Sequence, residues 1–356
     1  MKILHIADTH FGISPERDEI AFRCFSAALV AAVINKVDWV IHAGDIFDRA
    51  ILNAGDHNPI PRLINVLSNF KDPTDFRIPI VILRGTPTHD VKGSLEYLMP
   101  FAQVIQTETF IDCGGGLQFL CLPEVSKAEV GAAQNGQLEY NKLVRQKLQD
   151  LNERSDHDAL RILVAHLCIT DAESSTGYKP GSAIGAKELL SLSGAHAAML
   201  GDIHKAQVFS DGRVRYAGSI CHLNYGEVEA EKGCWLWEFN GKEIKSVEWI
   251  KLPSRQLLTL EAGESLLKVD AAGAEVKIRF RGKFVDDEGA LEKLKKTAHS
   301  VIFERIPEPP VIRLRSEEIG KAQTISEEVI EWGIVNETEI TPEILRKAGS
   351  ITGEAL

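Results

Sequence analysis

The sequence predicts an α/β fold, in which a layered β-sheet domain flanked by helices is followed by a small C-terminal α+β cap. Three observations support this prediction: five apolar runs in the first two thirds of the chain, a polar motif after each run, and a β-β-α-β pattern near the end. The apolar runs are residues 2–7, 38–43, 80–83, 160–165 and 197–200. Short continuous apolar runs are typical of strands that are buried on both faces of a parallel sheet.

The polar motifs that follow these runs gather side chains able to bind metals. In chain order they are Asp8-x-His10, Gly44-Asp45-x-x-Asp48, Thr88-His89-Asp90, Ala165-His166 and Gly201-Asp202-x-His204. Open α/β sheets place their sites at the carboxyl edge of the strands, so we expect these side chains to lie near one another. Carboxylates mixed with imidazoles suit a pair of divalent ions such as manganese, iron or zinc better than calcium or magnesium alone. The motifs therefore predict a two-metal hydrolase.

The order and spacing of the motifs resemble the calcineurin-like metallophosphoesterases, whose run is D-x-H, G-D-x-x-D, G-N-H-D, H and G-H-x-H. Within that superfamily, the sequence around the motifs is similar to that of SbcD-type proteins, the nuclease subunits of the SbcC/SbcD DNA-repair complex. The segments KILHIADTHFG, HAGDIFDRA, LRGTPTHD, LGDIHKAQ and RYAGSI carry this likeness. Any one of the motifs is weak alone, but five in the family's order are a specific signal.

The resemblance implies a ligand set and a mechanism. It places Asp8, His10, Asp45 and His204 on one metal, with Asp45 bridging to a second metal that His166 and Asp202 also hold. It implies that a water between the metals attacks phosphorus, while His89 donates to the phosphate and the departing oxygen without binding metal. Asp48 and Asp90 would orient the backbone and the ligands.

Two positions depart from the family's motifs. Thr88 occupies the place of the asparagine in G-N-H-D, and Asp202 replaces the first histidine of G-H-x-H. A threonine hydroxyl is a poorer neutral ligand than an amide oxygen, whereas the Asp202 carboxylate is harder than imidazole. Manganese is therefore the expected metal, with magnesium or iron as alternatives.

Each of these residues also has an ordinary explanation. An Asp after Gly at a strand end can simply cap a turn or a helix, which we favour for Asp45 or Asp202 taken alone. Together with His166 and His204, the metal site is the better explanation. The remaining histidines are expected in the core at His5, His42 and His196, and on the surface at His57, His157, His222 and His299.

The composition is that of an ordinary soluble globular protein, and its 356 residues are enough for more than one domain. No stretch reaches the length of a membrane span and the first strand is too short for a signal peptide, so we expect a cytoplasmic protein without a membrane partner. The six cysteines include no C-x-x-C pair. Neither disulfides nor a cysteine zinc site are expected.

The formal net charge of −11 argues against a general attraction to DNA. One segment is locally basic, because residues 276–284 alternate so that Lys277, Arg279, Arg281 and Lys283 project from one strand face. This stripe can contact DNA phosphates. The alternative is an exposed strand face that only keeps the protein soluble.

Three segments are predicted along the chain: a nuclease domain at 1–252, a cap at 253–318 and a tail at 319–356. The first ends in a hairpin, in which residues 233–239 and 246–252 flank the Asn240-Gly241 turn. The cap would contain strands at 257–260, 276–284 and 311–314 and a helix at 286–299, where SbcD-type proteins carry a DNA-contacting cap. The tail retains short helices at 326–332 and 342–348, and family members reach the SbcC ATPase through helices in this region.

A further helix at 61–70 presents an apolar face formed by Leu63, Ile64, Leu67 and Phe70. SbcD-type subunits pair as homodimers through helices in this region. The alternative is that the face packs inside its own domain.

Three functions from different classes compete. The first is a manganese-dependent DNA exonuclease and single-strand endonuclease that acts with an SbcC-type ATPase, and the cap with its basic strand favours it. The second is a small-substrate phosphodiesterase or phosphoprotein phosphatase, which the acidic charge allows. The third is a partner-binding scaffold with a decayed metal site, which the two departures at Thr88 and Asp202 keep open.

Overall fold

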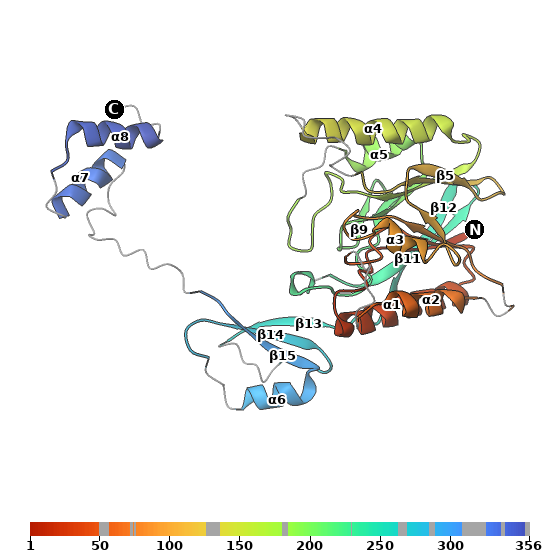
Figure 1. Cartoon of the computed structure of the whole chain (residues 1–356), viewed down its shortest axis with the longest axis horizontal. Coiled ribbons are helices and arrows are strands. Elements are labelled where there is room, and N and C mark those ends of the chain that lie inside the picture. The colour runs from red at the N-terminus through yellow and green to blue at the C-terminus, as the bar shows by residue number, and fades with distance from the viewer. Residues whose placement is uncertain are drawn as a thin grey trace. The chain divides into compact units, whose positions relative to one another are not determined.

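The computed structural model describes residues 1–49, 57–71, 74, 76–125, 136–179, 184–228, 230–262, 269–284, 289–307, 325–335 and 339–352 (Figure 1). The chain packs into two compact units. One unit contains residues 1–279 and 285–304, and the other contains residues 280–284 and 305–356. The expected domain boundaries at 252 and 318 stay predictions.

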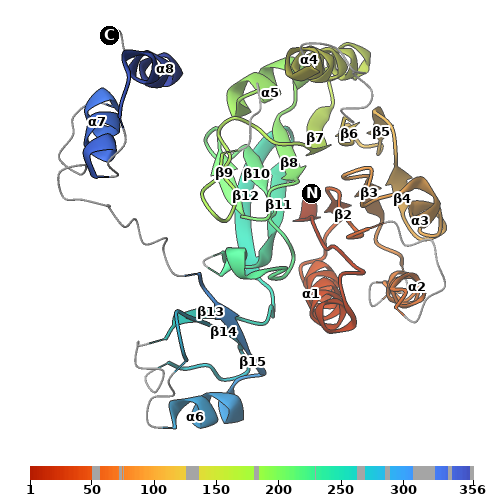
Figure 2. The same ribbon diagram turned by 60° about the vertical axis from the view of Figure 1, so that its left-hand side comes forward.

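The larger unit contains two six-stranded sheets (Figure 2). The first has the strand order β12-β11-β1-β2-β3-β4 and the second has the order β5-β6-β7-β8-β10-β9. Their strands are β1 (Lys2–Ile6), β2 (Trp39–His42), β3 (Ile80–Leu83), β4 (Gln103–Ile105), β5 (Thr109–Asp112), β6 (Leu117–Leu122), β7 (Leu160–His166), β8 (Ala197–Gly201), β9 (Gln207–Phe209), β10 (Val214–Tyr216), β11 (Gly233–Asn240) and β12 (Glu243–Lys251).

The five predicted apolar runs are confirmed as strands β1, β2, β3, β7 and β8. The pairs β1–β2, β2–β3 and β7–β8 are all parallel. The first three runs lie in one sheet and the last two in the other. Their polar motifs therefore come from the carboxyl ends of two sheets rather than one.

Apolar clusters join the layers. Because alternate residues of a strand point to opposite faces, β1 directs Leu4 and Ile6 toward α1 (Pro15–Ile34) and Ile3 toward the second sheet. On the far side of the second sheet, Leu148 of α4 (Gly136–Arg154) and Leu189 of α5 (Ala186–Ser193) belong to another apolar cluster, which lies between this sheet and the two helices. The result is a helix–sheet–sheet–helix arrangement, as the predicted fold class requires.

Local sequence explains where α1 begins. The Ser14 side chain accepts a hydrogen bond from the backbone of Arg17, and Pro15 occupies the first turn, where its missing N–H costs nothing. Glu16 and Asp18 add negative charge at the same end, where it interacts favourably with the positive end of the helix dipole and stabilises the helix.

The helix predicted at 61–70 is α2 (Ile60–Ser68), and its apolar face is used internally. Leu63, Leu67 and Phe70 belong to the core, and Ile64 packs against them. The face proposed for dimer contacts is therefore occupied by the protein's own core, as the alternative explanation required. A short helix, α3 (Lys92–Glu96), follows β3.

The predicted hairpin is confirmed as the antiparallel pair β11 and β12. Its two turn residues are Gly241 and Lys242, one position later than predicted, because Asn240 still pairs with Glu243. Gly241 has a φ of 58°, a conformation that glycine adopts without strain. Strand β11 also pairs with β1 and so extends the first sheet.

A three-stranded sheet in the order β13-β14-β15 follows, with β13 (Leu257–Glu261) parallel to β14 (Glu275–Phe280). Helix α6 (Ala290–Thr297) precedes β15 (Ser300–Arg305), so the order β-β-α-β is present. The strand after the helix is thus at Ser300–Arg305, and the predicted strand at 311–314 lies outside the described residues. In the smaller unit, α7 (Ile325–Val335) and α8 (Pro342–Thr352) pack against each other, at the two predicted tail helices.

Candidate metal centre

The strand ends carry an unusual backbone that turns polar side chains toward one another. Asp8, His10, Asp45 and Asp202 have φ values of 50°, 47°, 53° and 94°, in the left-handed region that non-glycine residues rarely adopt. Such strain persists only where the surroundings enforce it, and it gathers at functional sites. Gly44 shows how close the packing is, since a Cβ atom there would lie 2.2 Å from His166 Nδ1.

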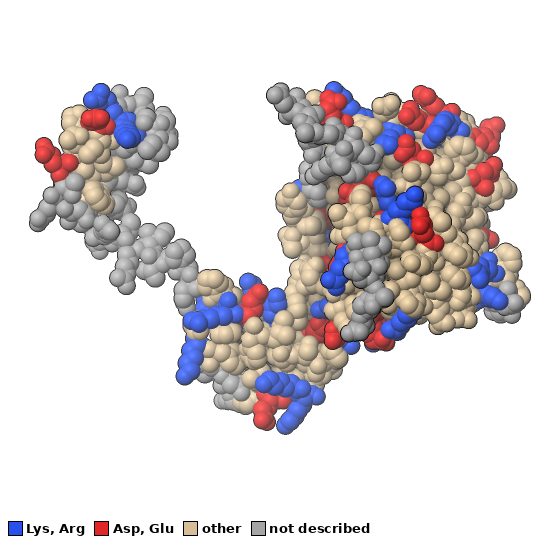
Figure 3. All heavy atoms as spheres, in the orientation of Figure 1, with Lys and Arg blue, Asp and Glu red and all other residues tan. Residues whose placement is uncertain are grey.

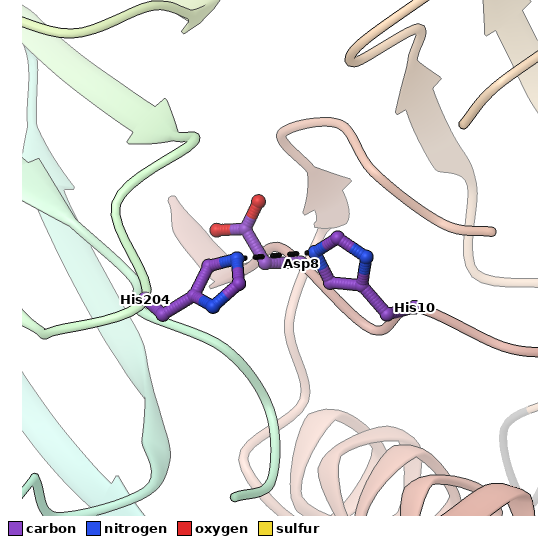
Figure 4. A group of neighbouring side chains, drawn as sticks. All are labelled: Asp8, His10 and His204. Atoms are coloured by element: carbon purple, nitrogen blue, oxygen red, sulfur yellow. Dashed lines mark hydrogen bonds between the residues drawn. The ribbon is translucent and has the colours of Figure 1, made fainter. Parts of the chain in front are cut away.

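Asp8, His10 and His204 form the first group of metal-binding atoms (Figure 4). The Nε2 atoms of His10 and His204 lie 3.1 Å apart and face each other. On the other side of its ring, His204 Nδ1 lies 2.8 Å from Glu227 Oε1. A carboxylate that accepts the Nδ1 proton leaves Nε2 as a free lone pair, which is how metal-binding histidines are commonly oriented.

Asp8, Asp45 and His166 form a second group. His166 Nδ1 lies 2.8 Å from the carbonyl oxygen of Ala43, so this nitrogen donates and Nε2 carries the lone pair. His166 Nε2 is buried without a hydrogen-bond partner among the described residues, 3.5 Å from Asp45 Oδ2 and 3.9 Å from Asp202 Oδ1. A buried acceptor beside two carboxylates is the environment that a cation would satisfy.

Burial and charge act against each other in this cluster. Burial raises the pKa of Asp8. Burial would also raise the pKa of Asp45, but the neighbouring imidazoles of His166, His89 and His10 outweigh it and hold this pKa well below its usual range. For His166, burial opposes protonation, yet Asp45, Asp202 and Asp8 raise its pKa well above 6.5. The buried carboxylates thus require positive charge, which two divalent ions would supply.

All six predicted ligands come together in this cluster: Asp8, His10, Asp45, His166, Asp202 and His204. A model of the calcineurin-like phosphoesterases matches residues 1–206, which is more than half of the chain. The chain belongs to the calcineurin-like phosphoesterase family. Members of this family depend on two metal ions, and the donor atoms of the cluster fit such a pair.

One curated relative of this phosphoesterase is the SbcD component of the nuclease SbcCD from Staphylococcus epidermidis, which is 24% identical over 73% of this chain and 72% of its own length. It supports the resemblance to SbcD-type proteins. Among solved structures, a dimetal phosphatase from Danio rerio is 10% identical, over 71% of this chain and 99% of its own, with a TM-score of 0.41. GAP50, the anchor in the inner membrane complex of Plasmodium, is 12% identical over 86% of this chain and 98% of its own, also with a TM-score of 0.41.

Three predicted auxiliary residues of the phosphoesterase lie around the ligands. His89 Nδ1 is 2.9 Å from Asp45 Oδ2, and this hydrogen bond raises the pKa of His89. Asp90 accepts backbone hydrogen bonds from Ile46, Phe47 and Gly85, and so joins the loops after β2 and β3. Asp48 Oδ1 lies 3.5 Å from His10 Nδ1. Asp48 therefore lies beside the predicted ligand His10, and Asp90 binds the backbone of the two residues that follow Asp45.

The position of Thr88 requires a correction. Thr88 is exposed in the turn before His89, and the threonine that contacts the cluster is Thr86. Thr86 donates its backbone N–H to Asp45 Oδ1 at 2.6 Å and its hydroxyl to Asp45 Oδ2 at 3.1 Å. The family's asparagine directly follows glycine and precedes histidine, whereas here three residues separate Gly85 from His89. Thr86 keeps the position next to the glycine, and Thr88 keeps only the position next to the histidine.

Two groups that the sequence did not indicate support the ligands of the phosphoesterase. Glu227, which is 2% exposed, holds His204 with Oε1 and accepts from Lys232 Nζ at 2.7 Å with Oε2. Lys232, also 2% exposed, donates in addition to Ser219 Oγ at 2.6 Å and to the carbonyl oxygen of His204 at 3.0 Å. The second group is Cys168, whose thiol donates to Asp202 Oδ2 at 2.7 Å.

The predicted basic stripe is only partly within a strand. Lys277 and Arg279 lie in β14, and both lie within 3.4 Å of Glu304, while Arg279 also lies 3.5 Å from Glu261. Arg281 and Lys283 follow the strand and are exposed. Figure 3 shows basic side chains gathered on the visible face of this part of the chain, with acidic side chains among them.

Among the other histidines, His196, expected in the core, is half-buried, and His222 departs from its predicted surface position. His5 and His42 are fully or almost fully buried, and burial lowers the pKa of each to about 3. His222, predicted on the surface, is only 9% exposed, with Nδ1 2.8 Å from Ser254 Oγ and Nε2 3.0 Å from the carbonyl oxygen of Ala230.

All six cysteines are free. None of the helices in the described segments is long and apolar enough to span a bilayer.

Proposed function

We propose that the chain is a manganese-dependent DNA nuclease, with exonuclease and single-strand endonuclease activity, that acts in DNA repair or recombination. The observation that carries this proposal is the buried cluster in which a ring nitrogen of each of His10, His166 and His204 lies within 4.8 Å of a carboxylate oxygen of Asp8 or Asp45. The likeness to the SbcD component of the nuclease SbcCD supports DNA as the substrate.

The residues of the cluster suggest how the reaction would proceed. Two divalent ions bound there would clamp the phosphate and lower the pKa of the attacking water. Asp45 Oδ2 lies 3.7 Å from His10 Nε2 and 3.5 Å from His166 Nε2, so Asp45 would be able to help hold both ions. His89 Nδ1 lies 2.9 Å from Asp45 Oδ2, which orients the ring, so His89 would be placed to deliver a proton to the departing oxygen.

The donor atoms favour manganese. Asp8, Asp45 and Asp202 supply hard, anionic oxygens, while three histidines supply nitrogens that magnesium would bind less well. Magnesium and iron remain the alternatives.

DNA would approach through the segment that contains β14. Lys277 and Arg279 are already paired with carboxylates, so we expect the exposed Arg281 and Lys283 to contribute more to phosphate binding. Substituting all four cations by Gln should weaken DNA binding and reduce its dependence on salt. Hydrolysis of a small chromogenic phosphodiester should be unchanged, and equal losses on both substrates would contradict this role.

The remaining parts of the proposal concern partners and location. The nuclease would act with an SbcC-type ATPase through α7 and α8, where Ile330 and Trp332 are exposed. A homodimer through helix 61–70 would have to use its outer face, because Leu63 and Leu67 are in the core. We keep the cytoplasm as the proposed location, without a membrane partner.

The alternatives are a small-substrate phosphodiesterase, a phosphoprotein phosphatase and a scaffold with a decayed metal site. One experiment separates them: metal content, together with degradation of labelled single- and double-stranded DNA at millimolar manganese, for the wild type and Asp45→Asn. Manganese-dependent DNA degradation that Asp45→Asn abolishes is expected. Hydrolysis of small esters or phosphoproteins without DNA degradation would favour the second function, and a protein that binds no metal would favour the scaffold.

A further inference from the structure

The three-stranded sheet is joined to α1 by a buried carboxylate. Glu275, at the start of β14, is 8% exposed. Its two carboxylate oxygens accept hydrogen bonds from the two terminal nitrogens of Arg17 at 3.3 and 2.6 Å, and Arg255 Nη1 also donates to Oε1 at 3.1 Å. A guanidinium that binds both oxygens of a carboxylate forms one of the stronger and more directional ion pairs in proteins. The start of β14 is therefore fixed to the first turn of α1, which contains Arg17.

A second contact joins the same sheet to the short helix η2 (Tyr225–Glu227). Lys277 Nζ lies 4.6 Å from the centre of the Tyr225 ring, which is a favourable cation–π distance, and β13 also packs against η2. Burial raises the pKa of Tyr225, the Glu275 carboxylate raises it further, and Arg17 lowers it. The contacts Arg17–Glu275 and Lys277–Tyr225 therefore lie close enough to influence one another.

The first contact lies a few residues from the predicted ligand His10. Arg17 follows the loop that contains His10, and the backbone N–H of Gly12 in this loop donates to Asp18 Oδ1 at 2.7 Å. Asp18 is in the first turn of α1 and is only 4% exposed. This buried hydrogen bond ties the loop to the turn, so a displacement of the turn would also move the His10 loop.

The second contact lies equally near the predicted ligand His204. Tyr225 and Glu227 belong to the same short helix, and Glu227 Oε1 lies 2.8 Å from His204 Nδ1, which orients the ring. The Nε2 atoms of His10 and His204 face each other at 3.1 Å. The three-stranded sheet thus contacts both segments that bring these two rings together, and the space between the rings depends on where those segments lie.

We propose that these two contacts position the metal centre: through them, the three-stranded sheet holds the loops of His10 and His204 at the separation that one metal ion requires. Arg17, Glu275, Tyr225 and Lys277 are then positioning residues, which touch neither metal nor substrate. Coupling between two sites is reciprocal, so a metal ion that binds more tightly when the sheet is in place must also stabilise the sheet in that place. The inference concerns the metal centre itself and does not depend on DNA being the substrate.

Calorimetric titration of manganese into metal-free protein tests the inference, with Glu261→Gln as the matched control for Glu275→Gln. Both substitutions replace a carboxylate of the three-stranded sheet by an amide and change the net charge equally, but Glu261 pairs with Arg279 inside the sheet. Glu275→Gln should weaken the binding of one of the two manganese ions by about 5-fold or more, the lower end of coupling between separate sites. Glu261→Gln should leave both affinities unchanged. Misfolding would instead lower the number of ions bound.

Arg17→Gln breaks the same contact from the other side and leaves the sequence of the sheet unchanged. It should weaken manganese binding as Glu275→Gln does, and the double variant should bind manganese no more weakly than either single variant, because all three lack the same contact. Unchanged affinity in Arg17→Gln or Glu275→Gln, or an equal loss in Glu261→Gln, would overturn the inference.

Amide hydrogen exchange gives a second readout, which follows the sheet instead of the metal. Manganese should slow exchange in β13 and β14 of the wild type, because the bound ion stabilises the sheet against α1 and η2. The slowing should be smaller in Arg17→Gln. Exchange in these strands that does not respond to manganese in the wild type would refute the coupling, whether or not the protein degrades DNA.

Discussion

The buried pair of Glu227 and Lys232 offers a quantitative test of how the site is supported. Replacing Lys232 by Met removes an ammonium that donates to Glu227, to Ser219 and to the carbonyl oxygen of His204, at 2.7, 2.6 and 3.0 Å. The Glu227 carboxylate, 2% exposed, is then buried without its cation. Removing one partner of a buried ion pair costs about 3–5 kcal/mol of folding free energy. For a domain of this size, that loss corresponds to a fall in Tm of roughly 6–20 °C.

The double variant Glu227→Gln, Lys232→Met separates the charge from the hydrogen bond. Its amide oxygen can still accept from His204 Nδ1, and no uncompensated charge remains, so it should be more stable than Lys232→Met by about 0.5–3 kcal/mol. Urea unfolding in the presence of a chelator measures both variants, because bound metal would otherwise add its own stabilisation. If the effects of the two single substitutions simply add in the double variant, the pair is not an energetic unit and the reasoning is refuted. Glu227→Ala, which removes the His204 hydrogen bond, should weaken manganese binding by about 10- to 100-fold.

Three further predictions concern the loop after β3, which contains Thr86 and His89, and the buried His222. His89→Ala should retain its metals and lose roughly 10²- to 10⁴-fold in turnover, and loss of metal measured by elemental analysis would show that His89 is a ligand instead. Thr86→Asn should tighten calorimetric manganese binding by about ten-fold, whereas Thr88→Asn, on the exposed side of the turn, should not change it. Burial lowers the pKa of His222 below 6.5, so the unfolded state binds its proton more readily and stability should fall as the pH drops below 6.5. Chemical denaturation at several pH values should show that the free energy of unfolding of His222→Gln changes less with pH than that of the wild type. The same pH dependence in both proteins would contradict a lowered pKa for His222.

The strands and the ligand cluster could be predicted because their signals are local. Each ligand follows an apolar run within a few residues, and the parallel arrangement brings the carboxyl ends together. The sequence did not indicate that the runs divide between two sheets, since apolar runs alone do not specify their neighbours. It also did not indicate Glu227 and Lys232, because charged residues in a loop are most often solvated. Only the fold shows that His204 and Ser219 enclose them.

Loop length explains why the sequence left the position of one predicted residue open. Two extra residues before His89 left two threonines as candidates for one position, and only the contacts of Asp45 distinguish Thr86 from Thr88. The sequence also predicts a helix that continues to His299. It therefore did not indicate the strand that begins directly afterwards at Ser300. The helix at 61–70 showed an apolar face, but amphipathicity cannot tell whether such a face meets the same chain or a second copy.

The two departures from the family's motifs act in the same direction on the metal. Thr86 uses its hydroxyl to donate to Asp45, so its oxygen supports a ligand carboxylate instead of supplying an amide oxygen as a donor. Asp202 adds an anionic oxygen where the family has imidazole, and its two oxygens are divided between the Cys168 thiol at 2.7 Å and the His166 ring at 3.9 Å. The centre therefore loses neutral donors and gains negative charge. That exchange favours the binding of hard divalent ions and favours zinc and nickel least. The two substitutions that weaken the likeness to the family therefore strengthen the preference of the centre for manganese.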